Sequence, residues 1–251
     1  EGTVRGFVAI LRRELFAYFV TPLAWVMMAA FLLLEGFFFF LLVLNYASQQ
    51  EVVSDAGPVE AFFGQTILLY LPLLLVCPLL TMRSFAEERR SGTIEALLTA
   101  PVSSTAVVLG KYLASVLTYA ALWAPTGLYM VVLSRYGDVD WRIVGTGYSA
   151  ILLVGAGYLA IGTLSSALTT SQLTAAVVTS VTVLLLFAFG IGEFALDPGP
   201  ARELCSYASV WSMMNDFSRG LVDSRRLVWC ATVILLPLFV SVRTVESWRW
   251  G

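Results

Sequence analysis

The side chains best suited to chemistry or recognition are the charged residues between positions 83 and 95. Glu87, Glu88, Arg89 and Arg90 follow one another there, whereas the long segments on either side are apolar. The chain contains no histidine, so it lacks a residue that a Ser-His-Asp triad, a Cys-His dyad or a histidine-ligated metal site requires. Neighbouring carboxylates and guanidinium groups give orientation and specificity at protein interfaces. We therefore interpret this segment as a recognition surface and predict no catalytic residue and no metal site.

Helix-capping signals define the shape of this segment. Ser84 and Glu87 have the spacing of a capping box, which predicts a helix that begins at residue 85. Gly92 suits the left-handed conformation that ends helices, and Thr93 can cap a second short helix. The result is a rigid elbow whose exposed charges and apolar ridge are predicted to be Glu87, Glu88, Arg89, Arg90, Glu95, Ile94 and Leu97. The simpler alternative is a solvated loop that only follows the positive-inside rule.

A second chemical feature is Glu35, the one charged residue in the apolar run 23–44. An acid inside a membrane span is costly, and it marks a functional site by default. We keep two hypotheses for Glu35. It lies on a substrate path or a dimer axis, or it is a protonated structural residue with local hydrogen bonds.

Composition places these residues in a membrane protein. Hydrophobic residues make up 59% of the 251 positions and charged residues 13%, against about half and a quarter in soluble domains. The apolar runs are continuous and about twenty residues long, which predicts helices. The net charge of −2 and the scattered basic residues argue against a nucleic-acid partner. The prediction is one all-α membrane domain, 1–251, with six transmembrane helices at about 23–44, 66–82, 105–134, 143–168, 173–191 and 227–242.

Two amphipathic helices are predicted outside the spans. Residues 4–19 place apolar side chains on one face and arginines on the other, as in a helix that lies in the membrane interface. A cytoplasmic extension of the first span is the alternative. Before the last span, Val210, Met214, Phe217 and Leu221 fall at helical spacing, which predicts a short helix in the outer leaflet.

Small residues are frequent in the fourth and fifth spans. Ala156 and Ala160 are four positions apart, and Gly155 and Gly162 are seven apart. Such spacing lets helix backbones approach closely. Both packing within the chain and a dimer interface remain open.

Orientation follows from the basic residues. If both termini and residues 82–105 are cytoplasmic, nine lysines and arginines lie inside and six outside. The positive-inside rule favours this arrangement. The predicted location is the bacterial cytoplasmic (inner) membrane.

Several motifs occur together along the chain. They are MRSFAEE at 82–88, GTIE at 92–95, LL at 97–98, Pro101, GK at 110–111 and FSRGLVDSR at 217–225. This combination resembles the type-2 ABC transporter permeases, particularly the gliding-motility-associated and copper-enzyme-maturation-associated branch. Met213-Met214-Asn215 stands where that branch often has a histidine just before the phenylalanine.

The resemblance implies a coupling helix within residues 84–100 that sits in a cleft of a separate ATP-binding subunit. Two such subunits would work with this chain and a second permease copy or a paralogue. ATP and magnesium would bind to the partner, and this chain would bind no cofactor. The residues assigned to ATPase coupling are Ser84, Glu87, Glu88, Arg89, Arg90, Gly92, Thr93, Ile94, Glu95 and Leu97. Those assigned to an extracytoplasmic helical or re-entrant element are Met214, Phe217, Arg219, Gly220 and Asp223.

The predicted function is the membrane subunit of an ABC transporter that exports or extracts a substrate, with ATP hydrolysed by another chain. The sole lysine, Lys111, does not complete a GxxxxGK[ST] phosphate-binding motif, so this chain is not expected to be the ATPase. Membrane lipids and an auxiliary extracytoplasmic protein are further predicted partners. The alternative is a membrane anchor that recruits a cytoplasmic partner without transport.

Overall fold

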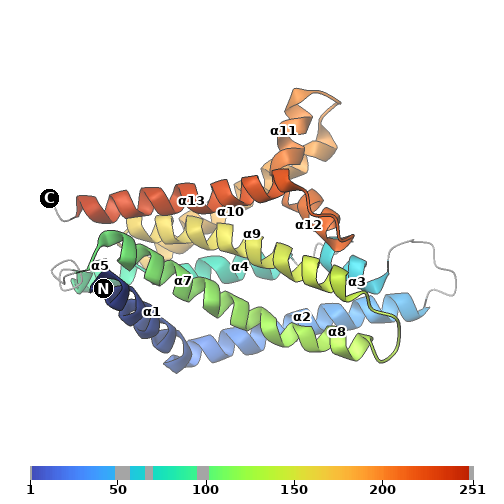
Figure 1. Cartoon of the computed structure of the whole chain (residues 1–251), viewed down its shortest axis with the longest axis horizontal. Helices are drawn as coiled ribbons and strands as arrows, with labels where there is room; N and C mark the ends of the chain where they lie inside the picture. The colour runs from blue at the N-terminus through green and yellow to red at the C-terminus, as the bar shows by residue number, and fades with distance from the viewer. Residues whose placement is uncertain (1, 49–56, 66–69, 95–101, 249–251) are drawn as a thin grey trace.

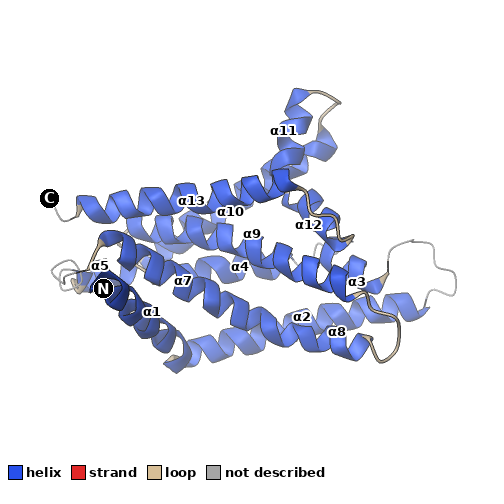
Figure 2. Ribbon diagram, in the orientation of Figure 1, coloured by secondary structure: helices blue, strands red, loops and turns tan. Residues whose placement is uncertain are grey.

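The computed structural model describes residues 2–48, 57–65, 70–94 and 102–248. Within these ranges the chain is helical and has no strand (Figure 2), which confirms the all-α prediction for the described part. The long helices are α1 (Gly2–Val20), α2 (Pro22–Ser48), α4 (Tyr70–Thr81), α7 (Ser104–Trp123), α9 (Trp141–Leu168), α10 (Gln172–Ala195) and α13 (Ser224–Ser247). The short ones are α3 (Pro58–Glu60), η1 (Ala61–Gln65), α5 (Ala86–Ser91), η3 (Ala124–Thr126), α8 (Gly127–Leu133), α11 (Pro200–Ala208) and α12 (Val210–Ser218).

Five helical segments are long and apolar enough to cross a membrane. They are Ala24–Ala47, Ser104–Leu133, Trp141–Leu168, Gln172–Ala195 and Ser224–Ser247. The third predicted span is continuous through α7, η3 and α8, and its α-helical pattern gives way to a 3-10 turn at Pro125, which lacks a backbone N–H. The second predicted span, 66–82, contains α4, and residues 66–69 lie outside the described ranges. A sixth crossing therefore stays a prediction.

Helix α9 forms the centre of the bundle, where it contacts α4, α7, α10, α12 and α13. Its glycines permit these close approaches, because a Cβ atom at Gly155 would overlap the Tyr119 ring and one at Gly162 would overlap Thr81. Ala160 is also fully buried. The small residues of this span therefore pack against helices of the same chain.

The two ends of the bundle differ. The start of α1, α5 and the end of α13 lie together at one end, called here the α5 end, and α3, α8 and α12 lie at the opposite end (Figure 1). Helix α1 packs along α7, where Ile10 lies against Gly110. Helix α11 projects from the bundle beyond the start of α13 (Figure 1).

Candidate functional site

Helix α5 is capped by another part of the chain. The hydroxyl oxygen Oγ of Ser166, on α9, accepts hydrogen bonds from the backbone N–H groups of Phe85 (3.0 Å) and Ala86 (3.1 Å). No side-chain cap comes from within the segment, and the helix begins at Ala86. The predicted Ser84–Glu87 capping box and the start at residue 85 are therefore wrong. Ser166 instead accepts from the backbone N–H groups at the start of α5. The Ser84 side chain is buried.

The end of α5 agrees with the sequence. Gly92 adopts a left-handed conformation, with φ of 73°, as expected of a helix C-cap. The Thr93 and Ser91 hydroxyls are 2.9 Å apart, and the chain is helical again at Ile94. The predicted coupling residues Glu95 and Leu97 lie outside the described residues.

Arg89 points into its own chain. Its Nη1 donates to the backbone carbonyl of Ala167 (3.0 Å), in the last turn of α9, and to that of Thr169 (3.4 Å). Its guanidinium also lies 4.8 Å from the centre of the Trp248 ring. The predicted exposed position of Arg89 is therefore wrong, because the free carbonyls at the end of α9 bind this cation.

Glu88 belongs to an ion network built around the buried Lys111. Its Oε1 lies 2.9 Å from Lys111 Nζ on α7 and 2.8 Å from Arg13 Nη2 on α1. Glu14 Oε1 contacts the same two cations, at 3.0 Å from Lys111 Nζ and 2.6 Å from Arg13 Nη2. The Lys111 side chain is only 2% exposed. The network fastens α1, α5 and α7 together, and Glu88 is not the freely exposed charge that the sequence predicted.

The electrostatics of the network favour the charged form of Glu14. Burial by itself raises the pKa of Glu14, but the attraction and hydrogen bonds of Lys111 and Arg13 outweigh burial and hold that pKa below its usual value. The other oxygen of Glu88, Oε2, is buried without a hydrogen-bond partner among the described residues. Glu87 and Arg90 remain exposed on the outer side of α5. These two, with Gly92 and Thr93, form the free surface of the predicted coupling segment.

Four important residues were not found from the sequence: Arg13, Glu14, Lys111 and Ser166. One signal was available, because Lys111 is the sole lysine and stands in an apolar run. A charge in such a place requires a buried partner. Its partner Glu14 is 97 positions away, so no local pattern identifies the pair.

A known protein family matches the part of the chain that contains α5. The profile of the ABC-2 family transporter protein matches residues 45–220, from the last turn of α2 to just beyond α12, and it includes α5. The chain belongs to the ABC-2 family of transporter proteins. This ABC-2 permease is therefore the membrane subunit of an ABC transporter and not the catalytic one, and such permeases normally work with an ATP-binding subunit. A search among curated proteins found no match.

At the opposite end of the permease, α12 is held inside the bundle. Met214 and Phe217 are fully buried, and Thr146 Oγ1 of α9 donates to the Phe217 carbonyl at 2.7 Å. The predicted short helix is therefore present as α12, and its apolar side chains fill the core of the bundle, whereas its position in the outer leaflet stays a prediction. Gly220, with φ of 75°, turns the chain, and the Asp223 carboxylate caps α13 by accepting from the Arg225 N–H at 2.9 Å. Arg219 is exposed.

Glu35 of the permease lies inside the bundle. Its side chain is 1% exposed, and its Oε1 has no hydrogen-bond partner among the described residues. The next residue, Gly36, abuts Tyr129 of α8, whose hydroxyl donates to the Leu32 carbonyl at 3.0 Å. The described residues contain no cluster of three or more histidine, cysteine or acidic side chains that could hold a metal.

Proposed function

We propose that α5 and the residues after it receive the motion of a separate ATP-binding subunit and pass it to the membrane helices during export or extraction of a substrate. The observation that carries this proposal is the attachment of α5 to three helices. Ser166 and Arg89 join α5 to α9, and Glu88 joins it to α1 and α7. A force on α5 therefore acts on buried, bonded groups and not on a flexible loop.

The free surface of the segment is suited to a partner. Glu87 and Arg90 carry opposite charges on the exposed side of α5, and Ile94 follows. Charge pairs of this kind fix the orientation of a bound partner protein, and apolar side chains beside them can fill a groove on that partner. Glu95 and Leu97, outside the described residues, complete the proposed contact.

The working unit in this proposal contains two permease chains, identical or paralogous, and two ATP-binding subunits that hold ATP and magnesium. The α5 end faces the cytoplasm, with both termini, in the bacterial cytoplasmic (inner) membrane. The excess of arginine and lysine near that end supports this orientation. At the other face, the projecting helix α11 is the proposed contact for an auxiliary protein, and its Leu204 is 64% exposed. Glu35 is the proposed residue of the substrate path.

The test reverses the two free charges of α5. The permease is produced with its ATP-binding subunit as Glu87→Arg with Arg90→Glu, and co-purification and ATPase activity in lipid are measured. We expect loss of binding or of coupling. Arg12→Glu on α1 is the matched control, because Arg12 is exposed and makes no described contact with α5.

Two outcomes would contradict the proposal. Normal co-purification and normal transport by the double variant would show that α5 is not the contact. Binding of a partner that hydrolyses no ATP would support the alternative of a membrane anchor.

A further inference from the structure

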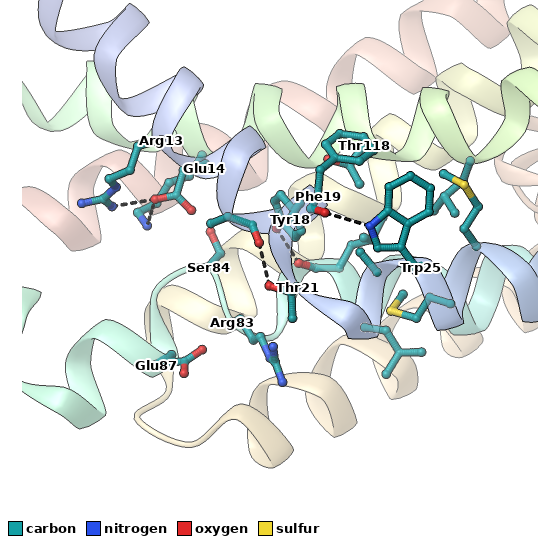
Figure 3. Close-up of a pocket in the computed structure, with 18 of the residues that line it drawn as sticks. Arg13, Glu14, Tyr18, Phe19, Thr21, Trp25, Arg83, Ser84, Glu87 and Thr118 are labelled. Atoms are coloured by element: carbon teal, nitrogen blue, oxygen red, sulfur yellow. Dashed lines mark hydrogen bonds and ion pairs between the residues drawn. The ribbon is translucent and has the colours of Figure 1, made fainter.

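A cavity of about 440 Å³ opens at the corner between α1 and α2 (Figure 3). This volume lies within the range of about 300–1,000 Å³ that is usual for small-molecule sites. Hydrogen bonds fix the corner, since Thr21 Oγ1 donates to the Ala17 carbonyl (2.6 Å) and Trp25 Nε1 donates to that of Phe19 (2.9 Å). The cavity is therefore a built feature of the fold, between α1, α2, α4, α7 and the start of α5.

Its walls are divided by polarity. Apolar side chains from α2, α4 and α7 form one part, and they include Met27, Met28, Leu79, Leu80 and Leu122. Charged side chains form the other part, and they are Arg13, Glu14, Arg83, Glu87, Glu88 and Lys111. Trp25, which is 59% exposed, also lines the cavity. Tryptophan is enriched at the membrane–water boundary, which favours a placement of the charged part at headgroup depth and of the apolar part deeper in the membrane.

Two of the charged residues are free to bind a ligand. Arg13, Glu14, Glu88 and Lys111 neutralise one another in the ion network. Arg83 and Glu87 are exposed, and their side chains have no ion pair or hydrogen bond within the described part of the chain. The mouth of the cavity thus offers one guanidinium and one carboxylate beside an apolar recess.

We propose that this cavity binds one phospholipid with a phosphoethanolamine headgroup, taken from the membrane leaflet at the α5 end. The Arg83 guanidinium binds the phosphate, for which its planar, multi-donor geometry is suited. The Glu87 carboxylate binds the ammonium, and it disfavours headgroups that carry only negative charge. One acyl chain occupies the recess beside Met28, Leu79 and Leu122.

Such a lipid contacts α1, α2, α4 and α7 at once, next to the ion network that fastens α5. The site rests on the position of the chain in a membrane and not on the proposed coupling to an ATPase. Glu87 belongs to both proposals, so the test of this site changes Arg83 and Ala24 instead and needs no ATP-binding subunit. The two proposals can then fail separately.

The experiment measures lipid retained by the full-length permease. The chain is reconstituted with equal amounts of phosphatidylethanolamine and phosphatidylglycerol, extracted into detergent, and examined by native mass spectrometry. We expect one retained phosphatidylethanolamine. Arg83→Gln should reduce its occupancy about tenfold, as expected for loss of a charge-assisted hydrogen bond. Ala24→Phe, which places an aromatic ring in the cavity, should do the same without changing a charge.

Arg12→Gln is the matched control, because Arg12 is an exposed arginine of α1 that does not line the cavity. It should retain lipid as the unmodified chain does. An equal loss of retained lipid in Arg12→Gln would indicate a general attraction of lipid to surface arginines and would overturn the proposed site. Retention of phosphatidylglycerol in preference, or undiminished retention by Arg83→Gln, would also overturn it. Arg83 is exposed, so its variant decides the question even if Ala24→Phe does not fold.

Discussion

Replacement of Lys111 by methionine is the most direct test of the ion network. Methionine keeps much of the length of the side chain and removes only the charge. Glu14 and Glu88, at 16% and 18% side-chain exposure, then share a single cation, Arg13, which is 54% exposed. Two carboxylates that are largely withdrawn from water lose their buried partner.

The expected cost follows from the degree of burial. Removal of one partner from a fully buried ion pair costs about 3–5 kcal/mol. Arg13 remains in place and both carboxylates keep some contact with water, so we expect a loss of about 2 kcal/mol in the free energy of unfolding. Neutralising all three groups, by Glu14→Gln, Glu88→Gln and Lys111→Met together, should recover most of this loss, because the one charge left without a partner, Arg13, is 54% exposed and stays in contact with water.

The assay is equilibrium unfolding of the purified permease in mixed micelles, carried out for each single variant, for the double variant Glu88→Gln with Lys111→Met, and for the combined triple variant. A double-mutant cycle between Lys111 and Glu88 should give a coupling free energy above about 0.5 kcal/mol, the usual limit for independent sites. Additive effects would refute the reasoning. So would a combined variant that is less stable than Lys111→Met alone.

Three further predictions concern single groups. Ser166→Ala should destabilise α5 by about 1 kcal/mol through loss of its cap, seen as faster hydrogen exchange at Phe85 and Ala86. The control Ser165→Ala should change this exchange rate less, because the Ser165 hydroxyl donates to a carbonyl of its own helix. Because the folded pKa of Glu14 is lowered, its contribution to stability is present above its usual pKa of 4.5 and is lost as pH falls through the lowered value. Melting temperatures across that range should therefore fall less steeply in Glu14→Gln than in the unmodified chain. Glu35→Gln should leave the melting temperature unchanged or raise it, since the carboxyl has an unpartnered oxygen, and should reduce transport-coupled ATPase activity; normal coupling would exclude Glu35 from the path.

Features that depend on neighbouring positions were predicted well from the sequence. Continuous apolar runs predicted the five candidate spans. Gly92 predicted the end of α5, because the preference of glycine for a left-handed backbone conformation depends on that residue alone.

Features that depend on distant positions were not predicted. The Ser84 hydroxyl has the correct spacing for a cap, but Ser166, 80 positions from Ala86, occupies that role. Glu88 and Arg89 have the composition of an exposed interface, but their partners lie on α1, α7 and α9. Charge and spacing alone do not distinguish a side chain that binds another protein from one that binds a remote segment of its own chain.

The contacts between α5 and α9 also have a consequence for biosynthesis. Each helix completes an end of the other, since Ser166 caps α5 and Arg89 binds the last carbonyls of α9. A ribosome makes α5 well before α9, so the first N–H groups of α5 lack this partner until the fourth predicted span has been inserted. The face that the proposed ATP-binding subunit would recognise is thus finished late, on a permease whose central helix is already in place. An incompletely inserted chain would present no ordered docking helix to its ATP-binding subunit.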